Sequence, residues 1–286
     1  NRFERMLKSH QVVEGIQWLA IGFFMKLVLA DNLALHIQLD AVENPYSIWL
    51  SIFLFGLRIY FDFAGYSFIA YGLALVIGIK LTVNFLAPYT ATDIQSFWRR
   101  WHVTLSSWFR DYVFIPLGGS RVPWAAANIL AVFAISGLWH GAGWNFILWG
   151  SYHGALLILH RYLRKIVSLP SLFNWLLTLA LVMTGWLFFM ETDSDRLFVK
   201  LGSMISLDGY AFPQLLDAVN SINNILHFVF FLTLSLIFLA LENLSFRSEK
   251  LTVYHLIRKP FIISILLGMT VLFVPKTVSQ FVYFAF

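Results

Sequence analysis

The stretch AISGLWHGAGWNFILWG, residues 134–150, joins two apolar runs of the sequence. The first run covers Trp124–His140 and the second covers Trp144–His160. Both approach the roughly 20 apolar residues that carry a helix across a bilayer. The stretch therefore predicts two membrane helices joined by a short turn. It also places His140 in apolar surroundings, where an ionisable side chain needs a functional or structural reason.

The composition of the whole chain is typical of a membrane protein. Of 286 residues, 59% are hydrophobic and 12% are charged, and the mean hydropathy is +0.73, whereas about a quarter of a soluble domain is charged. The net charge of +5 is modest, so we interpret the basic residues as topology signals and expect no nucleic-acid partner. Cysteine is absent, which excludes disulfides, thiolate metal ligands and an acyl-cysteine intermediate in this chain.

Seven apolar runs predict an all-α, polytopic membrane protein with a single transmembrane domain over residues 1–286. Ile48–Ile79 is too long for one straight crossing, so we expect either a bend or two short helices. The chain begins with Asn1 and has no signal-peptide pattern, so we expect it to be a fragment of a longer protein with further membrane helices before it. The runs are Val12–Ala30, Ile48–Ile79, Trp124–His140, Trp144–His160, Leu172–Met190, Ile222–Leu241 and Phe261–Val274.

Basic and acidic loops alternate between these runs. Because basic loops stay in the cytoplasm, we predict that residues 1–8, 80–121, 161–169 and 243–259 face that side. The acidic loop around Asp193 is predicted to face the opposite side. We expect a multi-pass protein of the cell inner (cytoplasmic) membrane, in contact with membrane lipid.

One connection between the runs has a pattern of its own. In TDIQSFWRRWHVTLSSWFRDYVF, residues 92–114, aromatic and aliphatic side chains recur at spacings of three to four residues, with the arginines on another face. The pattern predicts an amphipathic helix over Thr92–Tyr112 that lies along the membrane surface. Thr92 and Gln95 are a candidate capping box at its start, and His102 falls on its apolar side.

Three of the eight histidines follow an aromatic residue in an apolar context: His102 in RRWHVTL, His140 in GLWHGAG and His153 in GSYHGAL. Each could be a hydrogen-bonded link between helices or a functional group. Glycines at 137, 141 and 143 favour a functional His140, because another backbone or a substrate can approach the ring. The remaining histidines are interpreted as solvated or interfacial: His10, His36, His160, His227 and His255.

Several reaction classes lack their signatures. The metalloprotease pattern H-E-x-x-H and the serine elbow G-x-S-x-G are missing, and the histidines are too dispersed for an iron or zinc site, so we expect no metal. Ser136 and His140 stand four residues apart, which keeps an intramembrane serine hydrolase as an alternative. The favoured chemistry is a histidine base that acts on a hydroxyl group.

Arg58 and Asp62 stand four residues apart in GLRIYFDFAGY, within the second run. A charged residue at the centre of a membrane helix costs roughly 2.5–3.5 kcal/mol on insertion scales. Two opposite charges one helical turn apart can neutralise each other, so we predict a structural ion pair.

The segments IYFDFAGYSFIAYGLAL, NFLAPYTATDIQSFWRRWHVTLSSWFRDYVFIPLGG and GLWHGAGWNFILWGSYHG resemble the membrane-bound O-acyltransferase (MBOAT) family. The resemblance is strongest to the branch of the alginate O-acetyltransferase membrane subunit, with the teichoic acid D-alanyl transferase as a near relative. It implies that His140 lies at the reaction centre and that His102 is a second family histidine. It also implies a cytoplasmic acyl donor, an acceptor outside, and further N-terminal membrane helices.

On this interpretation the chain moves an acyl group, acetyl from acetyl-CoA, toward hydroxyls of an extracytoplasmic polysaccharide, directly or through an extracytoplasmic acyltransferase partner. No bound cofactor is needed. His140 would be the base and His102 would assist it, while Trp139, Asn145 and His153 would line the substrate path. A tryptophan indole N–H or Asn145 could stabilise the oxyanion. The arginines at 99, 100 and 110 would attract anionic lipid or the phosphates of coenzyme A. A non-catalytic acyl conduit is the alternative that needs no base.

Overall fold

The computed structural model describes residues 9–38, 44–166, 169–248, 256–276 and 281, and they are helical with no strand among them. Four segments of this described part are long and apolar enough to cross a membrane: Ser9–Ala34, Pro45–Val76, Ser171–Met190 and Ile225–Phe246. The predicted fold class, an all-α polytopic membrane protein, is confirmed. Residues 1–8, 167–168 and 249–255 of the predicted cytoplasmic loops lie outside the described residues.

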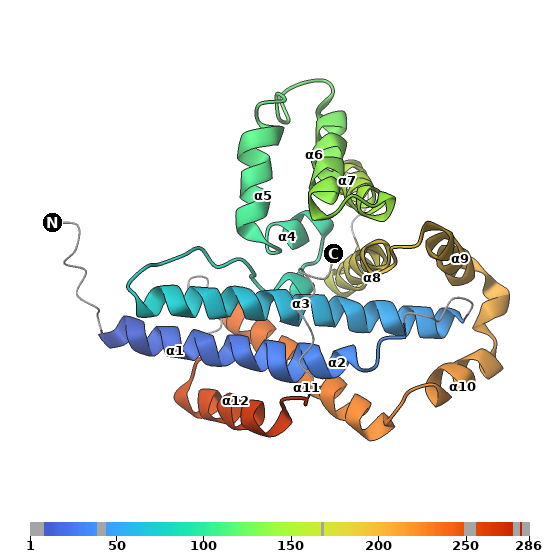
Figure 1. The fold of residues 1–286 in the computed structure, drawn as a ribbon. Coiled ribbons are helices and arrows are strands. Elements are labelled where there is room, and N and C mark those ends of the chain that lie inside the picture. The colour runs from blue at the N-terminus through green and yellow to red at the C-terminus, as the bar shows by residue number, and fades with distance from the viewer. Residues whose placement is uncertain (1–8, 39–43, 167–168, 249–255, 277–280, 282–286) are drawn as a thin grey trace. The chain divides into compact units, whose positions relative to one another are not determined.

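The helical elements follow one another along the chain (Figure 1) as α1 (Ser9–Phe23), η1 (Phe24–Ala30), α2 (Asp31–Ala34), α3 (Pro45–Val76), η2 (Pro88–Thr90), α4 (Ile94–Trp98), α5 (Val103–Phe109), η3 (Arg110–Phe114), α6 (Ala125–His140), α7 (Trp144–Leu163), α8 (Ser171–Met190), α9 (Ser194–Ile205), η4 (Leu207–Tyr210), α10 (Phe212–Asn220), α11 (Ile225–Ser248) and α12 (Pro260–Phe273). Every predicted apolar run overlaps one of these helices over most of its length. The elements α9, η4 and α10 were not predicted.

The chain divides into two compact units, which are described separately. The first unit comprises Asn1–His36, Leu57–Ala87 and Asn224–Ala285, and the second comprises Ile37–Gly56 and Pro88–Asn223. The long helix α3 contributes its first turns to the second unit and its remainder to the first. The single transmembrane domain over residues 1–286 stays a prediction.

Helix α3 is continuous over 32 residues, so the alternative of two short helices is wrong, and the bend stays a prediction. At 1.5 Å per residue it is about 48 Å long, more than a roughly 30 Å hydrocarbon core requires. Its glycines pack against α1 instead of breaking the helix. A Cβ on Gly72 would lie 2.6 Å from the Gly15 carbonyl oxygen, and one on Gly65 would lie 2.8 Å from that of Gly22.

This seam of glycines explains how α1 runs alongside α3 in the first unit (Figure 1). Small residues at seven-residue spacing on both helices allow the two backbones to touch. In a membrane such close packing supplies the association energy that the hydrophobic effect cannot supply between helices in lipid. Trp18 packs beside the seam, with its ring 4.9 Å from that of Phe68 and 5.3 Å from that of Tyr71.

A buried charge cluster follows directly after this seam. Lys26 Nζ lies 2.8 Å from Asp31 Oδ1 and 2.6 Å from Asp62 Oδ1, and all three side chains are at most 3% exposed. Lys26 belongs to the π-helix η1, whose i to i+5 spacing brings it over Asp31. Asp62 thus has Lys26 of the neighbouring helix as a partner, and the Arg58–Asp62 ion pair stays a prediction.

Other polar groups of the first unit are paired as well. His36 Nε2 lies 2.9 Å from His227 Nδ1, and His227 Nε2 lies 3.2 Å from Asn32 Oδ1. The buried hydroxyl of Tyr60 donates a hydrogen bond to Glu242. The interpretation of His36 and His227 as merely solvated or interfacial residues is thus wrong, because they join two helices.

In the second unit α6 and α7 form a tight helical hairpin, seen as adjacent helices in Figure 1. A Cβ on Gly137 would collide with the Phe146 carbonyl oxygen, and one on Gly150 would collide with that of Phe133. Helix α8 lies against α7, because Asn145 Nδ2 donates to the Phe188 carbonyl at 3.1 Å and the Tyr152 hydroxyl donates to the Leu181 carbonyl at 2.9 Å. This three-helix arrangement carries most of the predicted site.

Candidate active site

His140 is the last residue of α6, and aromatic rings surround its half-buried side chain. Its ring centroid lies 5.0 Å from that of Trp149 and 5.3 Å from that of Phe189, both in edge-to-face arrangements. Trp139 lies 5.0 Å away but is 56% exposed. A short connection follows His140 directly. The ring neighbours Trp149 and Phe189 belong to α7 and α8, the next two helices along the chain.

The glycines around His140 allow the chain to pack closely. A Cβ on Gly137 would meet the Phe146 carbonyl, and a Cβ on Gly141 would meet the Phe146 ring. Of the two explanations that the sequence offered, close approach of another backbone applies to Gly137. At Gly141 the space beside the backbone is filled by the Phe146 ring. The expectation that Gly141 leaves space for a substrate is therefore wrong.

The second predicted histidine lies where a helix is interrupted. A single helix over Thr92–Tyr112 was predicted, but α4 ends at Trp98 and α5 begins at Val103. His102 has a backbone φ of +44°, a left-handed conformation that a helix cannot contain. The predicted capping box is also wrong, since Asp93 rather than Thr92 caps α4 by accepting from the Ser96 N–H at 2.7 Å.

The interruption gives His102 a defined tautomer. Its Nδ1 accepts a hydrogen bond from the Leu105 N–H at 3.4 Å and so caps α5. A neutral imidazole whose Nδ1 accepts carries its proton on Nε2, so Nε2 is the donor of this ring. Burial lowers the pKa of His102 to about 4, which keeps the ring neutral at physiological pH.

The two predicted histidines both belong to the second unit. His102 is near enough to His140 for a charge on one ring to act on the other. The helix break makes this possible because it places His102 at a turn, while Trp101 beside it is buried against Trp186 at 4.9 Å. A continuous surface helix has no such turn.

His153 extends the aromatic cluster on α7. Its side chain is 1% exposed, and its ring lies 5.3 Å from Trp149 and 5.0 Å from Trp98. Neither nitrogen of His153, nor the indole nitrogen of Trp98 or Trp149, has a hydrogen-bond partner among the described residues. Gly185 of α8 lies against His153 Nε2 so closely that a Cβ there would collide with it.

The remaining predicted site residues have structural surroundings. Asn145 is 2% exposed, and its donation to Phe188 ties the start of α7 to the end of α8. Ser136 is not hydrogen-bonded to His140 in the described structure, so the nucleophile–base contact of a serine hydrolase is not formed. The three arginines do not share one free face: Arg100 donates to Thr90 Oγ1 at 2.8 Å, and Arg110 pairs with Asp111 at 2.7 Å.

Sequence reasoning missed Trp149, Trp186 and Tyr89. Trp186 Nε1 donates to the Tyr89 hydroxyl at 3.1 Å, and that hydroxyl donates to the Gly56 carbonyl. Burial raises the pKa of Tyr89 above its usual range. One signal was available for Trp149. The buried positions of α7, which are 145, 146, 149, 150, 153 and 154, repeat at helical spacing and combine asparagine, aromatic residues, glycine and histidine on one face.

An all-helical membrane fold with a tryptophan-rich cluster around His140, on which a charge at His102 can act, defines a membrane-embedded protein with a candidate acid–base site. Residues 11–191 match the model of the MBOAT, membrane-bound O-acyltransferase family. The chain belongs to this family, as the resemblance of its motifs predicted.

The chain is similar to curated relatives of three kinds. It is 37% identical to the peptidoglycan O-acetyltransferase of Helicobacter pylori over 244 residues, which cover 79% of this chain and 46% of that protein. It is 40% identical to the probable alginate O-acetylase of Pseudomonas aeruginosa over 219 residues, covering 73% and 42%. It is 32% identical to the teichoic acid D-alanyltransferase of Bacillus subtilis over 212 residues, covering 64% and 53%. The chain thus spans about half the length of the curated relatives it matches.

Proposed function

We propose that the protein containing this chain is a membrane O-acyltransferase that transfers an acetyl group from a cytoplasmic thioester to hydroxyls of an extracytoplasmic polysaccharide. The observation that carries the proposal is the pair of neighbouring histidines, His140 and His102, within a tryptophan-rich wall. The relatives named for O-acetyl transfer favour acetyl over D-alanyl as the acyl group. Their names favour a cell-surface polysaccharide as the acceptor.

His140 is proposed as the general base. A hydroxyl is a weak nucleophile at neutral pH, so its attack on a thioester needs a group that removes the proton as the new bond forms. In the proposed step the hydroxyl oxygen bonds to the acyl carbon, its proton passes to the His140 imidazole, and the carbon–sulfur bond breaks. The imidazolium then returns the proton to the departing thiolate. The products are an ester and a thiol, and no metal or redox partner is required.

The aromatic neighbours of His140 support this role. Trp149 and Phe189 meet its ring edge-to-face, which fixes the imidazole and limits the water around it. Exclusion of water protects a thioester from hydrolysis and keeps the imidazole in its neutral, basic form. Trp139 is more exposed and is proposed to contact the substrate at the open side of the ring.

His102 is proposed as a hydrogen-bond donor rather than a second base. Its Nδ1 is occupied by the Leu105 N–H, so the proton of the neutral ring is on Nε2. A neutral Nε2–H can donate to the carbonyl oxygen of the donor as negative charge develops there. The proposed location is the cytoplasmic membrane, and the proposed acyl donor is acetyl-CoA. An extracytoplasmic acyltransferase is proposed as the partner protein.

The decisive experiment is acetyl transfer by His140→Gln in membranes that contain the whole protein. Glutamine keeps a polar side chain of similar size but cannot take the proton, so we expect a loss of about 10²–10⁴-fold in rate. His160→Gln is the matched control, because it makes the same change at a half-buried histidine of α7 whose partner is Asp93 at 3.7 Å. Near wild-type transfer by inserted His140→Gln protein would overturn the proposal and favour the conduit.

Two further variants separate the roles of the other residues. His102→Asn keeps a side-chain acceptor for the Leu105 N–H and tolerates the left-handed backbone, but it lacks the imidazole. If His102 donates in the reaction, the loss of rate in His102→Asn approaches that in His102→Ala. If it serves only as a cap, asparagine restores the activity. Ser136→Ala should keep full activity, whereas the serine hydrolase alternative requires its loss.

A further inference from the structure

The connection between α8 and α11 contains α9, η4 and α10, and α10 has an exposed apolar stripe. Phe212, Leu215, Leu216 and Val219 recur at spacings of three and four residues, and all four are exposed, with Phe212 at 68%. Amphipathic helices normally turn such a stripe toward a core. In α10 only Ala218 is buried, so no described residue covers the stripe.

Helix α9 and the turn after it continue this apolar surface. Phe198, Ile205 and Leu207 are all exposed, Leu207 at 85%, while Leu197 on another face of α9 is fully buried. The two helices therefore each have a face that is packed within the second unit and a face that the described residues leave uncovered. Single exposed apolar residues are ordinary, but a run of them over two consecutive helices marks an interaction surface.

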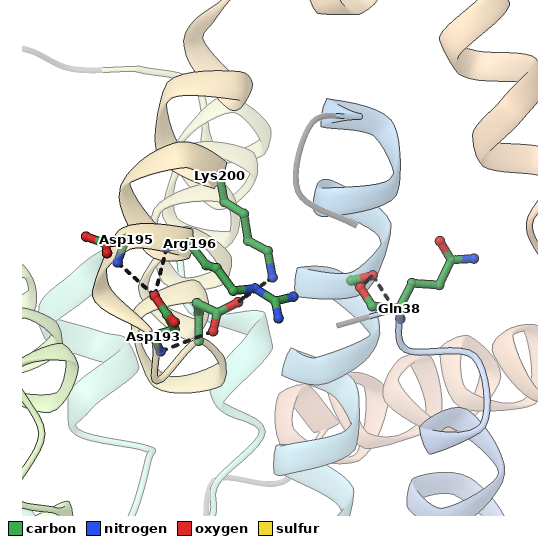
Figure 2. A network of polar contacts seen from close by, with 7 residues as sticks. Gln38, Asp193, Asp195, Arg196 and Lys200 are labelled. Carbon is green, nitrogen blue, oxygen red and sulfur yellow. Dashed lines mark hydrogen bonds and ion pairs between the residues drawn. The ribbon is translucent and has the colours of Figure 1, made fainter. Parts of the chain in front are cut away.

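The start of α9 is fixed to the end of α8. Lys200 is 1% exposed, and its Nζ lies 2.6 Å from Glu191 Oε2, next to the last residue of α8. Asp193 caps α9 by accepting from the N–H groups of Asp195 and Arg196 at 2.9 and 3.0 Å, as Figure 2 shows. Only three residues separate the two helices, so α9 begins at the level where the membrane helix α8 ends.

Polar contacts hold the other side of α10 and η4. Asn44 Nδ2 donates to the Gln214 carbonyl at 2.8 Å, and Trp49 Nε1 donates to the Tyr210 hydroxyl at 2.9 Å. Gln38, whose N–H donates to Ser51 Oγ in Figure 2, also donates to the Ser221 carbonyl at 3.0 Å. These contacts hold the polar side of the connection and leave its apolar stripe exposed.

We infer that α9, η4 and α10 form an amphipathic strap that lies in the lipid–water interface, with the α10 stripe inserted among the acyl chains. Three residues join one membrane helix to the start of α9, and four residues join the end of α10 to the next membrane helix. The connection is therefore held close to the bilayer surface at both ends. An interfacial helix buries its apolar face roughly 5–10 Å into the headgroup and acyl boundary.

Charge indicates which feature of the lipid is bound. Residues 191–221 contain five acidic and two basic residues. Anionic headgroups attract basic segments, so they offer this strap no electrostatic gain. Its contact is therefore with the hydrocarbon of any phospholipid, and neither salt nor anionic lipid should be needed for it.

The absence of cysteine from the chain makes a direct test simple. Leu216→Cys and Asp217→Cys place a spin label on adjacent exposed residues of α10, one on the stripe and one about 100° away around the helix. The whole protein is reconstituted in phosphatidylcholine vesicles at about one copy per vesicle. Collision of each label with oxygen, which partitions into lipid, and with a water-soluble nickel chelate is then measured.

The label at position 216 is expected to collide at least several-fold more with oxygen than with the chelate, and the label at 217 is expected to show the reverse. The pattern should be unchanged at high salt. Equal access of the chelate to both labels would overturn the inference. If the label at position 216 collides little with the chelate and also little with oxygen, a protein segment and not lipid covers the stripe, and the inference is overturned. Protection that depends on the protein-to-lipid ratio would indicate a second copy, which equally overturns the inference.

Discussion

Two clusters of polar side chains, one in each unit, differ in how their members are bonded. In the first unit Lys26 neutralises two carboxylates, His36 bonds to His227, and Tyr60 bonds to Glu242. In the second unit the cluster next to His140 contains His153, Trp98 and Trp149, whose nitrogens have no hydrogen-bond partner among the described residues. Both sets are buried and both lie on apolar helices.

The difference separates structural from functional polarity. A buried charge is costly unless it is paired, so the paired groups of the first unit hold helices together. An unpaired buried donor contributes nothing to stability and is retained in spite of its desolvation cost. Such a group needs an explanation other than stability, and a catalytic role is one such explanation. The comparison supports a structural role for the Lys26 cluster and agrees with the proposed catalytic role of the aromatic cluster around His140.

The largest loss of stability is expected when the ion pairs of the Lys26 cluster are removed. Lys26→Met removes the cation from two buried carboxylates, and loss of one partner of a buried ion pair costs about 3–5 kcal/mol. The amount of folded, inserted protein and its resistance to denaturant in detergent measure this loss. Activity per folded molecule should change little, because the cluster is not part of the proposed site.

Arg58→Met is the matched control for Lys26→Met. Both variants remove a cation from an apolar helix, but Arg58 makes no ion pair within 4 Å among the described residues, while Lys26 makes two. We expect Arg58→Met to be clearly less destabilising. Equal losses in the two variants would contradict the assignment of Asp62 to Lys26 and revive the pair predicted from the sequence.

Most of the fold could be predicted from the sequence, because lipid imposes a strict rule on it. Every spanning backbone must satisfy its own hydrogen bonds, so an apolar run of sufficient length has to be a helix. The connections carry no such rule. The break at His102 depends on Trp101 reaching Trp186, about 85 residues later in the chain, and a helical pattern over residues 92–112 gives no sign of it.

The candidate site could be predicted in part for a similar reason. His140 and His102 are recognisable from their apolar context and from the family motifs. Their neighbours are not, because Trp149, Trp186 and Phe189 come together through helix packing rather than through local spacing. The Arg58–Asp62 prediction has the same limit: it considered one helix turn and not the adjacent helix, where Lys26 of the π-helix η1 contacts Asp62.

The next effect concerns how tightly the unpaired cluster is packed. Gly185→Ala adds a methyl group that would collide with His153 Nε2, and overpacking of this kind costs roughly 1–3 kcal/mol. His153→Ala should relieve the collision, so a double-mutant cycle is expected to give a large coupling between the two sites. Gly202→Ala on α9 is the control, because nothing lies within 4 Å of its added Cβ. Additive effects of Gly185→Ala and His153→Ala would contradict direct contact.

A smaller effect should distinguish an unpaired indole from a paired one. Trp149→Phe and Trp186→Phe remove the same ring volume, but only Trp186 Nε1 makes a hydrogen bond, to Tyr89. A hydrogen bond contributes about 0.5–1.5 kcal/mol, so Trp186→Phe should be less stable than Trp149→Phe by about that amount. Activity should follow the opposite order, because Trp149 packs directly on His140. The same order in both measurements would remove the distinction between the two kinds of polar group.

The smallest effect is a pH dependence that belongs to His102. Its native pKa of about 4 lies below the 6.5 of an unperturbed histidine, because burial disfavours the charged ring. Between pH 6.5 and 4 the unfolded chain binds a proton that the native protein does not bind, so the free energy of unfolding falls as the pH falls through this window and is level above it.

His102→Asn keeps the cap on α5 but cannot take up the proton. Contributions of other histidines with lowered pKa, such as His36, are common to both proteins and cancel in their difference. The apparent melting temperature of the wild type should therefore fall more steeply than that of His102→Asn between pH 6.5 and 4.5, by a few degrees, and the two should run parallel above pH 7. Parallel curves over the whole range would mean that His102 is solvated when folded, which would remove it from the dry wall that the site requires.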